Sequence, residues 1–582
     1  MARYHLQPYT TTPIQPVSFF NAFSEKVFDY RGEKKINRLL GELNVADKDF
    51  FIESLLLKLN IQYNVLAEDL QKIPLQGAFA VVANHPFGVV DALLLLKIIK
   101  SIRADFMLAD NGILKNILPA SEHIIHMHPL EKEISTGHSF SGVNEVFKNF
   151  ENGNAVGFFP SESPSFFQPE NNTFEDGVWN HKIVKIIQTA EVPVLPIYFE
   201  GNYNKLYHVA ENFFAGLKKI KFPSEILQQK ESLIKVRIGA PIPLKQLKQF
   251  GSTNKLARFL RAKTYGLKSA VKVKKFYLPV LKKKKNLPQE IAPAINKNLL
   301  TAEIEMLKQQ GHLLLSQQNF EVYIAGHAEC PQIMAETGRL REITFREVGE
   351  GTGLKYDLDE YDLYYKQLIL WDTETQSIAG GYRLGLGDYI IQHYGIKGFY
   401  TRSLFKIDNE LLPVLQHSVE LGRSYVVKAY QQKRLPLFLL WKGILTFLQH
   451  QPQYQYLFGP VSISNKYNDV SKTLIIEFIK RNYFDNELAK HIKPRKKYAV
   501  DLKNIDIDIL VETAEKDIKL IDRYIQDFDP CMNSAPVLLK KYLNQNAKIA
   551  GFNTDPKFSD VIDGLMFLNL KDLPPGTVEC LQ

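Results

Sequence analysis

The stretch Ala78-Phe79-Ala80-Val81-Val82-Ala83-Asn84-His85-Pro86-Phe87-Gly88-Val89-Val90-Asp91 decides the fold of the first half of this 582-residue chain. Its first six residues form a continuous apolar run, which is typical of a β-strand buried on both faces of a sheet. Pro86 cannot continue a strand but suits the start of a helix, and a helical run follows over residues 89–100. His85 is therefore expected at the carboxyl end of a buried strand, where open α/β sheets place their clefts.

His85 and Asp91 stand six positions apart in this stretch. On one continuous helix their side chains would point about 240° apart. A non-helical turn at residues 86–88 would instead fold His85 back over the first turn of the helix. An Asp in that position can hold one imidazole nitrogen and make the other a general base. A capping His with an Asp that favours the helix dipole is the alternative, and the residues alone leave both open.

Strand-like and helical runs alternate outward from this stretch. Further strands are expected at residues 155–159, 193–199 and 234–238, and helices at residues 142–150 and 181–190. Such alternation predicts an α/β domain. The expected domains are residues 1–255, a basic linker at 256–312, and a second, α+β domain at 313–582.

The positive charge of the chain is concentrated in one place. The net charge is +9, yet residues 258–285 hold eleven Lys and Arg and no Asp or Glu, and the remainder holds 61 basic against 63 acidic residues. A solvated linker, an anionic membrane surface and an acidic acyl carrier protein are alternative explanations for this segment. A nucleic-acid partner is not expected, because no nucleic-acid-binding motif accompanies the charges.

Cysteine usage and hydropathy bear on the compartment. The three cysteines are far apart and lack metal-ligand spacing, which predicts a reducing compartment, no disulfide framework and no metal site. The N-terminus has no apolar signal region, and no run reaches the ~18 apolar residues of a transmembrane helix. We therefore expect a cytoplasmic protein that works on lipid from the surface, peripheral on the inner face of a bacterial cytoplasmic membrane.

The frame Asn-His-Pro-x-Gly-x-x-Asp at residues 84–91 resembles the histidine–aspartate motif of the glycerolipid acyltransferase superfamily. It is most similar to the bacterial, hemolysin-like branch that O-acylates amino-acid lipids, as are residues 109–118, 176–179, 192–201 and 236–242. The resemblance covers about residues 20–250 and implies a glycerolipid-acyltransferase-like αβ domain. It implies His85 and Asp91 as catalytic residues, with Asn84 and Gly88 in the substrate site.

One segment departs from that branch. Residues 159–165 read Phe-Pro-Ser-Glu-Ser-Pro-Ser, where the branch has Phe-Pro-Ala-Gly-Glu-x-Ser. The glycine is missing and the acid stands one place earlier, so a close backbone approach is lost. The resemblance implies that Glu162 and Ser163 bind the acceptor; a solvated loop acid is the alternative for Glu162.

Charged residues recur beside apolar runs in the second half. Strands are expected at residues 320–325, 364–371, 377–384 and 454–458, with a helix at 413–420. The charged positions are Arg339, Arg341, Asp357, Asp359, Asp362, Arg383, Glu420 and Arg423. Buried charges need partners, and Arg with Asp or Glu is the natural pair. An ion-pair network that only holds the sheet explains these residues as well as a binding site does.

Three motifs in this half resemble acyl-homoserine-lactone synthases of the GNAT fold, and still more closely the N-acyltransferases that make ornithine and glycine lipids. They are residues 359–362 (Asp-Glu-Tyr-Asp), 382–384 (Tyr-Arg-Leu) and 420–424 (Glu-Leu-Gly-Arg-Ser). Residues 458–464 (Phe-Gly-Pro-Val-Ser-Ile-Ser) and 558–565 (Phe-Ser-Asp-Val-Ile-Asp-Gly-Leu) are similar to these families as well. The resemblance spans about residues 315–570. It implies acyl transfer from a 3-hydroxyacyl thioester to an amino-acid amine, without a covalent enzyme intermediate.

That resemblance also implies roles for individual residues. Glu420 is expected to act as a base or to orient the amine. Arg383 and Arg423 are expected to bind the acyl donor or the amino-acid carboxylate. Asp359 and Asp362 are expected to orient the amine or to hold Arg341.

The two resemblances describe consecutive steps, N-acylation of an amino acid and O-acylation of the resulting 3-hydroxyl. The expected protein is an α/β bifunctional acyltransferase that makes phosphorus-free amino-acid lipids, with no tightly bound cofactor and with acyl-ACP or acyl-CoA as cosubstrate. The expected partners are acyl carrier protein, an anionic membrane surface bound through residues 258–285, the amino acid and the lyso-aminolipid. The alternative is a lysophospholipid O-acyltransferase with a non-catalytic, acyl-carrier-binding C-terminal domain.

Overall fold

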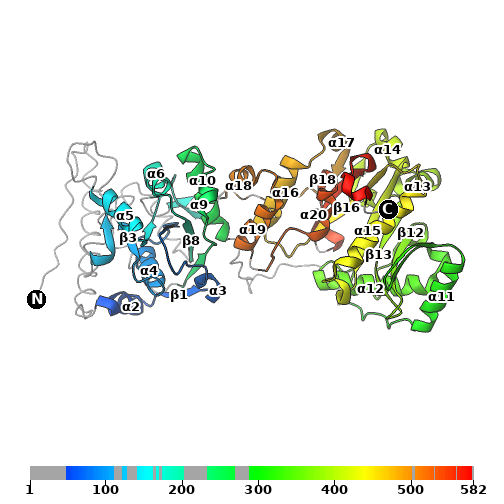
Figure 1. The fold of residues 1–582 in the computed structure, drawn as a ribbon, viewed down its shortest axis with the longest axis horizontal. Coiled ribbons are helices and arrows are strands. Elements are labelled where there is room, and N and C mark those ends of the chain that lie inside the picture. The colour runs from blue at the N-terminus through cyan, green and yellow to red at the C-terminus, as the bar shows by residue number, and fades with distance from the viewer. Residues whose placement is uncertain are drawn as a thin grey trace, which may run out of the picture. The chain divides into compact units, whose positions relative to one another are not determined.

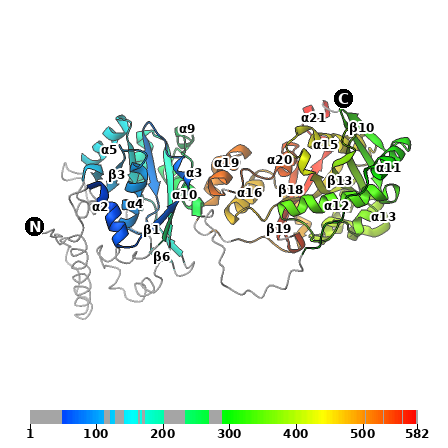
Figure 2. The same ribbon diagram turned by 90° about the horizontal axis from the view of Figure 1, so that it is seen from below.

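The structure, a computed structural model, divides the chain into two compact units (Figures 1 and 2). One unit comprises residues 1–272 and 502–513, and the other comprises residues 273–501 and 514–582. The described residues are 48–110, 121–127, 141–161, 166–168, 173–201, 233–268, 288–500, 502, 505–529, 531–558 and 560–579. The expected acceptor residues Glu162 and Ser163 lie outside them.

Within its described residues, the first unit is built on a seven-stranded sheet in the order β1-β9-β8-β2-β5-β3-β4. The strands are β1 (Gln62–Val65), β2 (Phe79–Ala83), β3 (Met107–Asp110), β4 (Ile124–His126), β5 (Ala155–Phe158), β8 (Val194–Gly201) and β9 (Leu233–Ile238). The β8–β9 pair is antiparallel and the other pairs are parallel. The helices are α2 (Lys48–Lys58), α3 (Ala67–Leu70), α4 (Val89–Lys100), α5 (Ser141–Glu151), α6 (His181–Ala190), α9 (Leu244–Leu247) and α10 (Thr253–Gly266).

Strand β2 is an inner strand of this sheet, and helix α4 is buried with it in one hydrophobic core, as the apolar runs predicted. β2 pairs with β5 on one side and β8 on the other, and all five of its residues are buried. Ten of the twelve residues of α4 are buried as well. Each buried leucine of such a helix contributes about 1.5–3 kcal/mol relative to an exposed one. The β2–α4 connection is therefore anchored at both ends, and it carries His85.

Within its described residues, the second unit is built on an eight-stranded sheet in the order β10-β11-β12-β13-β15-β16-β19-β18. The strands are β10 (Leu313–Gln317), β11 (Phe320–Gly326), β12 (Lys366–Asp372), β13 (Ser377–Leu386), β15 (Ser418–Val426), β16 (Tyr456–Ile463), β18 (Lys548–Asp555) and β19 (Val561–Asn569). The β15–β16 pair is parallel and the other pairs are antiparallel. Its longer helices are α11 (Lys297–Gln309), α12 (Pro331–Val348), α15 (Arg434–Gln449), α16 (Asp469–Asn482) and α19 (Ile518–Phe528).

The helix expected at residues 413–420 is wrong in its second half. Helix α14 (Leu412–Gln416) ends early, and β15 begins at Ser418. Pairing with β13 on one side and with β16 on the other makes the strand the better structure from Ser418 onward. Glu420 consequently lies on a central strand of the sheet.

The segment expected to be a basic linker, residues 256–312, contains parts of two folded helices. Leu256, Phe259 and Leu260 of α10 are buried in the first unit. Leu300, Ile304 and Leu307 of α11 are buried in a core cluster of the second unit. Seven of the eleven basic residues between positions 258 and 285 lie outside the described residues. The sequence did not predict that residues 502–513 belong to the first unit.

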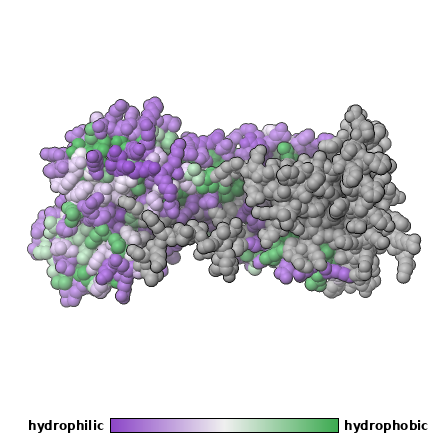
Figure 3. All heavy atoms as spheres, turned by 180° about the vertical axis from the view of Figure 1, so that it is seen from behind, coloured by the Kyte–Doolittle hydropathy of each residue, from purple (hydrophilic) through white to green (hydrophobic). Residues whose placement is uncertain are grey.

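The helices of the described residues bear on a relation to the membrane. None of those helices is both long enough and apolar enough to cross a membrane. On the face in Figure 3, the surface of the described residues shows small, separate hydrophobic groups among hydrophilic side chains.

Candidate active sites

A tight turn joins β2 to α4 and brings His85 to Asp91. Gly88 caps the helix with φ 60° and ψ −126°, a backbone conformation that glycine adopts readily. The helix begins at Val89, so Asp91 lies in its first turn. His85 Nδ1 is 3.3 Å from Asp91 Oδ2. The fold-back that would let Asp91 hold His85 is therefore present.

Asp91 is fully buried under this turn. Burial raises its pKa to about 6, although His85 and the backbone N–H of Phe87 act to lower it. That N–H donates to Asp91 Oδ2 at 2.7 Å. At neutral pH the side chain is mainly a carboxylate, and an imidazolium beside it would be stabilised.

Asp176 fixes the backbone of His85, and Phe159 packs against its ring. The His85 N–H donates to Asp176 Oδ1 at 3.1 Å, and Trp179 Nε1 donates to Asp176 Oδ2 at 3.1 Å. The imidazole stacks on Phe159, with ring centroids 4.2 Å apart. The His85 side chain is 15% exposed. With Nδ1 directed at Asp91, Nε2 is the nitrogen suited to take a proton from a substrate.

Asn84, which the resemblance implies for the substrate site, makes two hydrogen bonds to the neighbouring strand. Its Nδ2 donates to the carbonyl oxygen of Phe199 at 3.0 Å, and its Oδ1 accepts from the Phe199 N–H at 2.7 Å. The amide thus ties the end of β2 to β8. Its contribution in this structure is to hold the strand end that carries His85.

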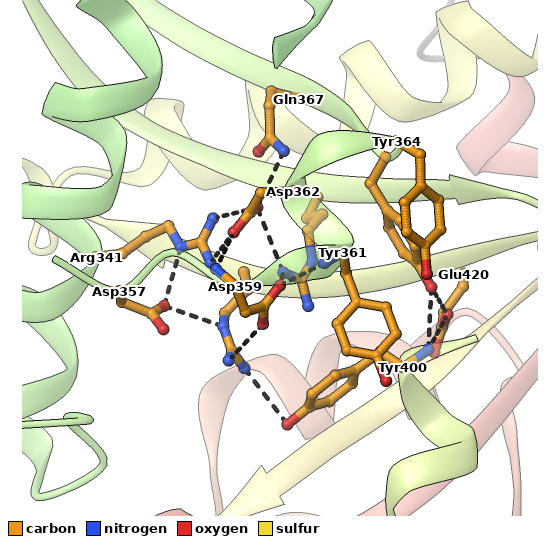
Figure 4. A network of polar contacts seen from close by, with 12 residues as sticks. Arg341, Asp357, Asp359, Tyr361, Asp362, Tyr364, Gln367, Tyr400 and Glu420 are labelled. Carbon is orange, nitrogen blue, oxygen red and sulfur yellow. Dashed lines mark hydrogen bonds and ion pairs between the residues drawn. The ribbon is translucent and has the colours of Figure 1, made fainter. Parts of the chain in front are cut away.

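Arg341 on α12 belongs to a buried ion-pair network in the second unit (Figure 4). Its side chain is 1% exposed, Nε donates to Asp357 Oδ2 at 3.0 Å, and Nη1 donates to Asp362 Oδ1 at 2.9 Å. Burial acts to raise the pKa of Asp362, but Arg341 and Arg383 outweigh it and hold that pKa well below its usual range. This carboxylate therefore stays charged throughout the physiological pH range.

Arg383 and Arg423 complete the network through Asp359. Arg383 Nη1 donates to Asp359 Oδ1, and Arg423 Nη2 lies 3.2 Å from Asp359 Oδ2. Arg423 Nε is also 3.0 Å from Asp357 Oδ2. Burial acts to lower the pKa of Arg423, but Asp357 and its other neighbours raise it. Three guanidinium groups thus face three carboxylates, which is how buried charges become tolerable.

Arg423 has an unusual backbone. Its φ is 49°, in the left-handed region. Strand β13 pairs Gly381 with Tyr425 and Arg383 with Gly422, so residues 423 and 424 of β15 stand against one residue of β13. This is a β-bulge, a device that redirects side chains next to functional sites.

In Figure 4, the Tyr361 ring lies between Glu420 and the network of arginines and aspartates. It is 1% exposed. Its carboxylate accepts hydrogen bonds from the Tyr365 hydroxyl, from the Tyr400 N–H at 3.0 Å and from the Thr401 N–H at 2.7 Å. Burial raises the pKa of Glu420 despite these donors. Glu420 therefore fixes the turn η8 (Tyr400–Ser403) against the sheet.

A pocket of about 190 Å³ lies where β15 and β16 separate. The two strands pair only through residues 418–420 and 456–458, although each continues farther. At Gly459, where they part, an added Cβ would lie 2.1 Å from the carbonyl oxygen of Leu421. The pocket is lined by Phe345, Glu350, Tyr400, Arg423, Ser424, Pro460, Val461, Ser462, Leu538, Asp555, Phe558, Val561 and Asp563.

Comparison with known proteins places both units in known families. A family of acyltransferases matches residues 28–274, and the acetyltransferase (GNAT) domain matches residues 340–441. A glycine N(alpha)-acyltransferase of Bacteroides thetaiotaomicron is 31% identical over 288 residues, which are 47% of this chain and 83% of that protein. The chain belongs to the glycine N(alpha)-acyltransferase family.

Two further relatives come from Phocaeicola vulgatus. A glycine N(alpha)-acyltransferase is 30% identical over 46% of this chain and 83% of its own length. A lyso-glycine lipid O-acyltransferase is 26% identical over 39% of this chain and 83% of its own length. This member of the glycine N(alpha)-acyltransferase family is thus an acyltransferase with two acyltransferase-type domains, and the predicted fold class and bifunctional character are confirmed. Both domain families use acyl thioester donors.

In this family member, the structure sorts the site residues that the sequence predicted. It brings His85 to Asp91, and it gathers Arg341, Asp359, Asp362, Arg383 and Arg423 into one network. Among all of these residues, only Arg423 also lines the pocket. Arg341 and Asp362 are bound to partners within the protein, so their part in the site is to support Arg383 and Arg423.

Sequence reasoning missed several residues of both sites. Asp176, which accepts from the His85 N–H, stands in the quoted motif of residues 176–179 but received no role. Tyr365 and Tyr400, which surround Glu420, carried no signal beyond their aromatic neighbours. Asp563 stands in the motif of residues 558–565 but received no role, although an isolated acid inside the strand-like run Val-Ile-Asp-Gly-Leu was an available signal.

Proposed function

We propose that this acyltransferase makes an amino-acid lipid with two acyl chains. The GNAT unit joins a 3-hydroxyacyl group to the amine of glycine or a similar amino acid. The first unit then acylates the 3-hydroxyl of that lyso-lipid. One observation carries the proposal: a single chain matches both a glycine N(alpha)-acyltransferase and a lyso-glycine lipid O-acyltransferase over 83% of each protein's length.

The geometry of His85 and Asp91 supports the second step. His85 Nε2 would remove the proton of the 3-hydroxyl as its oxygen attacks the thioester carbonyl. The tetrahedral intermediate collapses, the C–S bond breaks, and the imidazolium returns the proton to the leaving sulfur. Asp91, buried 3.3 Å from Nδ1, would stabilise the imidazolium between these events.

The first step needs no covalent intermediate, because an amine is itself a competent nucleophile for a thioester. It needs a deprotonated amine, a polarised carbonyl and alignment of the two. The pocket between β15 and β16 offers Arg423 and several carboxylates for that alignment. The pocket and the relatives' names support the same reaction type.

The donor and the docking surface are part of the proposal. Acyl carrier protein is the favoured donor carrier, because its acidic surface complements the basic residues 258–285. The same residues would attract the protein to an anionic bilayer, at about 1 kcal/mol for each nearby Lys or Arg. Salt-dependent binding to carrier protein and to vesicles with anionic lipid, each measured separately, would distinguish the two partners.

The test is expression of the full chain in a bacterium that lacks amino-acid lipids, followed by lipid mass spectrometry. The wild type should produce a diacylated amino-acid lipid, and His85→Ala should accumulate the mono-acylated lyso-lipid. His181→Ala, which changes an exposed histidine of the same unit, is the matched control and should resemble the wild type. Acylation of lysophosphatidate without any acylated amino acid would contradict the proposal and support a lysophospholipid O-acyltransferase.

A further inference from the structure

Asp563 is a buried acid in the wall of the pocket between β15 and β16. It lies on β19, is 4% exposed, and stands directly opposite Ser462 of β16. The Ser462 hydroxyl donates to its Oδ1 at 2.7 Å. No hydrogen bond from the described residues reaches its Oδ2. A carboxylate oxygen that accepts from no donor among the described residues, in the wall of a pocket, is a place where a ligand's N–H would be stabilised.

The charges around Asp563 favour a cationic ligand. Asp555 of β18 and Glu350, just after α12, line the same pocket. Both acids raise the pKa of Asp563, whereas Arg423 lowers it. The charge of Asp563 in turn raises the pKa of the Tyr400 hydroxyl, which lines the same pocket. Arg423 is shared with Asp357 and Asp359, so it offsets the charge of Asp563 only in part.

The size and polarity of the pocket fit the small end of a substrate. About 190 Å³ is less than the roughly 300–1,000 Å³ of drug-sized sites. A free amino acid carries an ammonium and a carboxylate a few bonds apart. The acids would attract the ammonium, and Arg423, the guanidinium that lines the pocket, suits the carboxylate.

Glu420 cannot serve as the proton acceptor in this geometry. Its two oxygens accept from one hydroxyl and two backbone N–H groups, and its side chain is not part of the pocket wall. Its partners include the N–H of Tyr400, whose side chain does line the pocket. Glu420 is therefore a positioning residue.

We propose that Asp563 binds the amino-acid ammonium and accepts its proton, while Arg423 holds the amino-acid carboxylate. This inference rests on the N-acylation step of the proposed function and names the amine-binding residue of that step. The ammonium gives one proton to Asp563 Oδ2. The neutral nitrogen then attacks the thioester carbonyl and forms the C–N bond. As the intermediate collapses, the C–S bond breaks, and the second proton of the nitrogen ends on the leaving sulfur.

The acidity of the group is suited to this task. Burial, and after it Asp555 and Glu350, raise the pKa of Asp563 to about 7 against the opposing effect of Ser462. The α-ammonium of a free amino acid is a weaker acid than that of a peptide terminus, whose pKa is about 7.7–8.0, so a carboxylate with a raised pKa accepts its proton more readily than an ordinary one. An acid held fully charged, like Asp362, would be a much weaker base.

The test measures N-acylation by the purified full chain with an acyl thioester and glycine, from pH 6 to 9. Asp563→Asn should lower kcat by about 10²–10⁴-fold, the usual contribution of a general base, with a smaller change in KM for the thioester. Its residual rate should lose the rise through neutral pH. Hydroxylamine, which is already neutral there, should react nearly as well with the variant as with the wild type. Asp560→Asn, three residues away and exposed, is the matched control.

Ser462→Ala keeps the carboxylate and provides a second test. It removes a donor that lowers the pKa of Asp563, so the midpoint of the pH–rate profile should move upward without loss of the maximal rate. A wild-type kcat and a wild-type pH profile in the Asp563→Asn variant would overturn this inference but would leave the proposed function standing. Absence of any N-acylated product from the wild type would overturn the proposed function together with it.

Discussion

Two buried aspartates, one in each unit, show opposite responses to burial. Asp91 faces one imidazole and one backbone N–H, and its pKa rises to about 6. Asp362 faces Arg341 and Arg383, and its pKa falls well below its usual range. Both side chains are at least 97% buried. Burial is therefore matched between them, and the charge of the partner decides the direction of the shift.

This contrast separates two uses of a buried acid. A carboxylate locked between guanidinium groups contributes to stability and exchanges no proton near neutral pH. A carboxylate that is only partly compensated costs stability, but it can respond to a proton on its neighbour. By this criterion Asp91 and Asp563 belong to the reactive class, and Asp357 and Asp362 to the structural class.

The largest expected effect comes from Asp91→Asn. The amide preserves the shape and can still accept from the Phe87 N–H, but it cannot stabilise an imidazolium. The rate of O-acylation of a supplied lyso-lipid should fall by about 10²–10⁴-fold. The unfolding midpoint at pH 8 should stay the same or rise, because an incompletely compensated charge has been removed. A stable variant with the wild-type rate would contradict the catalytic role of Asp91.

Asp362→Asn should show the reverse pattern. It leaves two buried guanidinium groups with too little negative charge, and breaking such a pair costs about 3–5 kcal/mol. The denaturant midpoint of the second unit should fall accordingly, while O-acylation by the first unit continues. Unchanged stability together with lost N-acylation would instead make Asp362 a substrate ligand.

The two acids should also separate along the pH axis. Because the folded-state pKa of Asp91 is raised, the folded state binds its proton more tightly, and stability falls as pH rises from about 4 to 6. The carboxylate needed for O-acylation is lost as pH falls through about 6. The lowered pKa of Asp362 has the opposite sign: its stabilisation is present above about pH 4 and is lost only as pH falls through the folded-state value.

At pH 5, O-acylation of supplied lyso-lipid should therefore be reduced, while the near-UV circular dichroism of the second unit remains native. Asp91→Asn supplies the control, since any acid step that remains in its rate belongs to protonation of His85 and not to Asp91. Simultaneous loss of O-acylation and of the near-UV signal would show that acid unfolding, rather than titration of Asp91, causes the change.

The sequence predicted most where a local pattern carries the structure. The apolar run before His85 and the Pro–Gly turn were sufficient for β2, α4 and the His85–Asp91 geometry. It failed at residues 413–420, because the apolar residues around Glu420 fit a helix as well as a strand, and only pairing with β13 and β16 decides between them.

Long-range partners were the other limit of sequence reasoning. Asp362 holds Arg341, as the sequence predicted, but the second partner is Asp357, and Asp359 pairs with Arg383 and Arg423 instead. That the pocket would recruit Asp563 from β19 was not foreseeable, because 140 residues separate it from Arg423 in sequence. The order of strands in the sheet brings β15, β16 and β19 together, and no local pattern encodes that order.

The smallest expected effect concerns Arg258, the first cation of the basic segment. Its Nε is 2.6 Å from Asp506 Oδ2, a shorter contact than any made by Arg341 to its carboxylates. Yet the Arg258 side chain is 52% exposed, against 1% for Arg341. Water and salt screen such a pair, so Asp506→Asn should cost no more than about 1 kcal/mol and even less at high salt.

Urea unfolding of the first unit at low and high salt measures this cost, with Asp517→Asn, a more exposed acid of the second unit, as control. A loss of several kcal/mol would mean that residues 502–513 depend on this ion pair to stay in the first unit. The expected small loss would instead assign their attachment to Ile509, Leu510 and Val511, which are 0–2% exposed. Distance alone thus ranks ion pairs wrongly in this protein, and the exposed fraction of the guanidinium ranks them correctly.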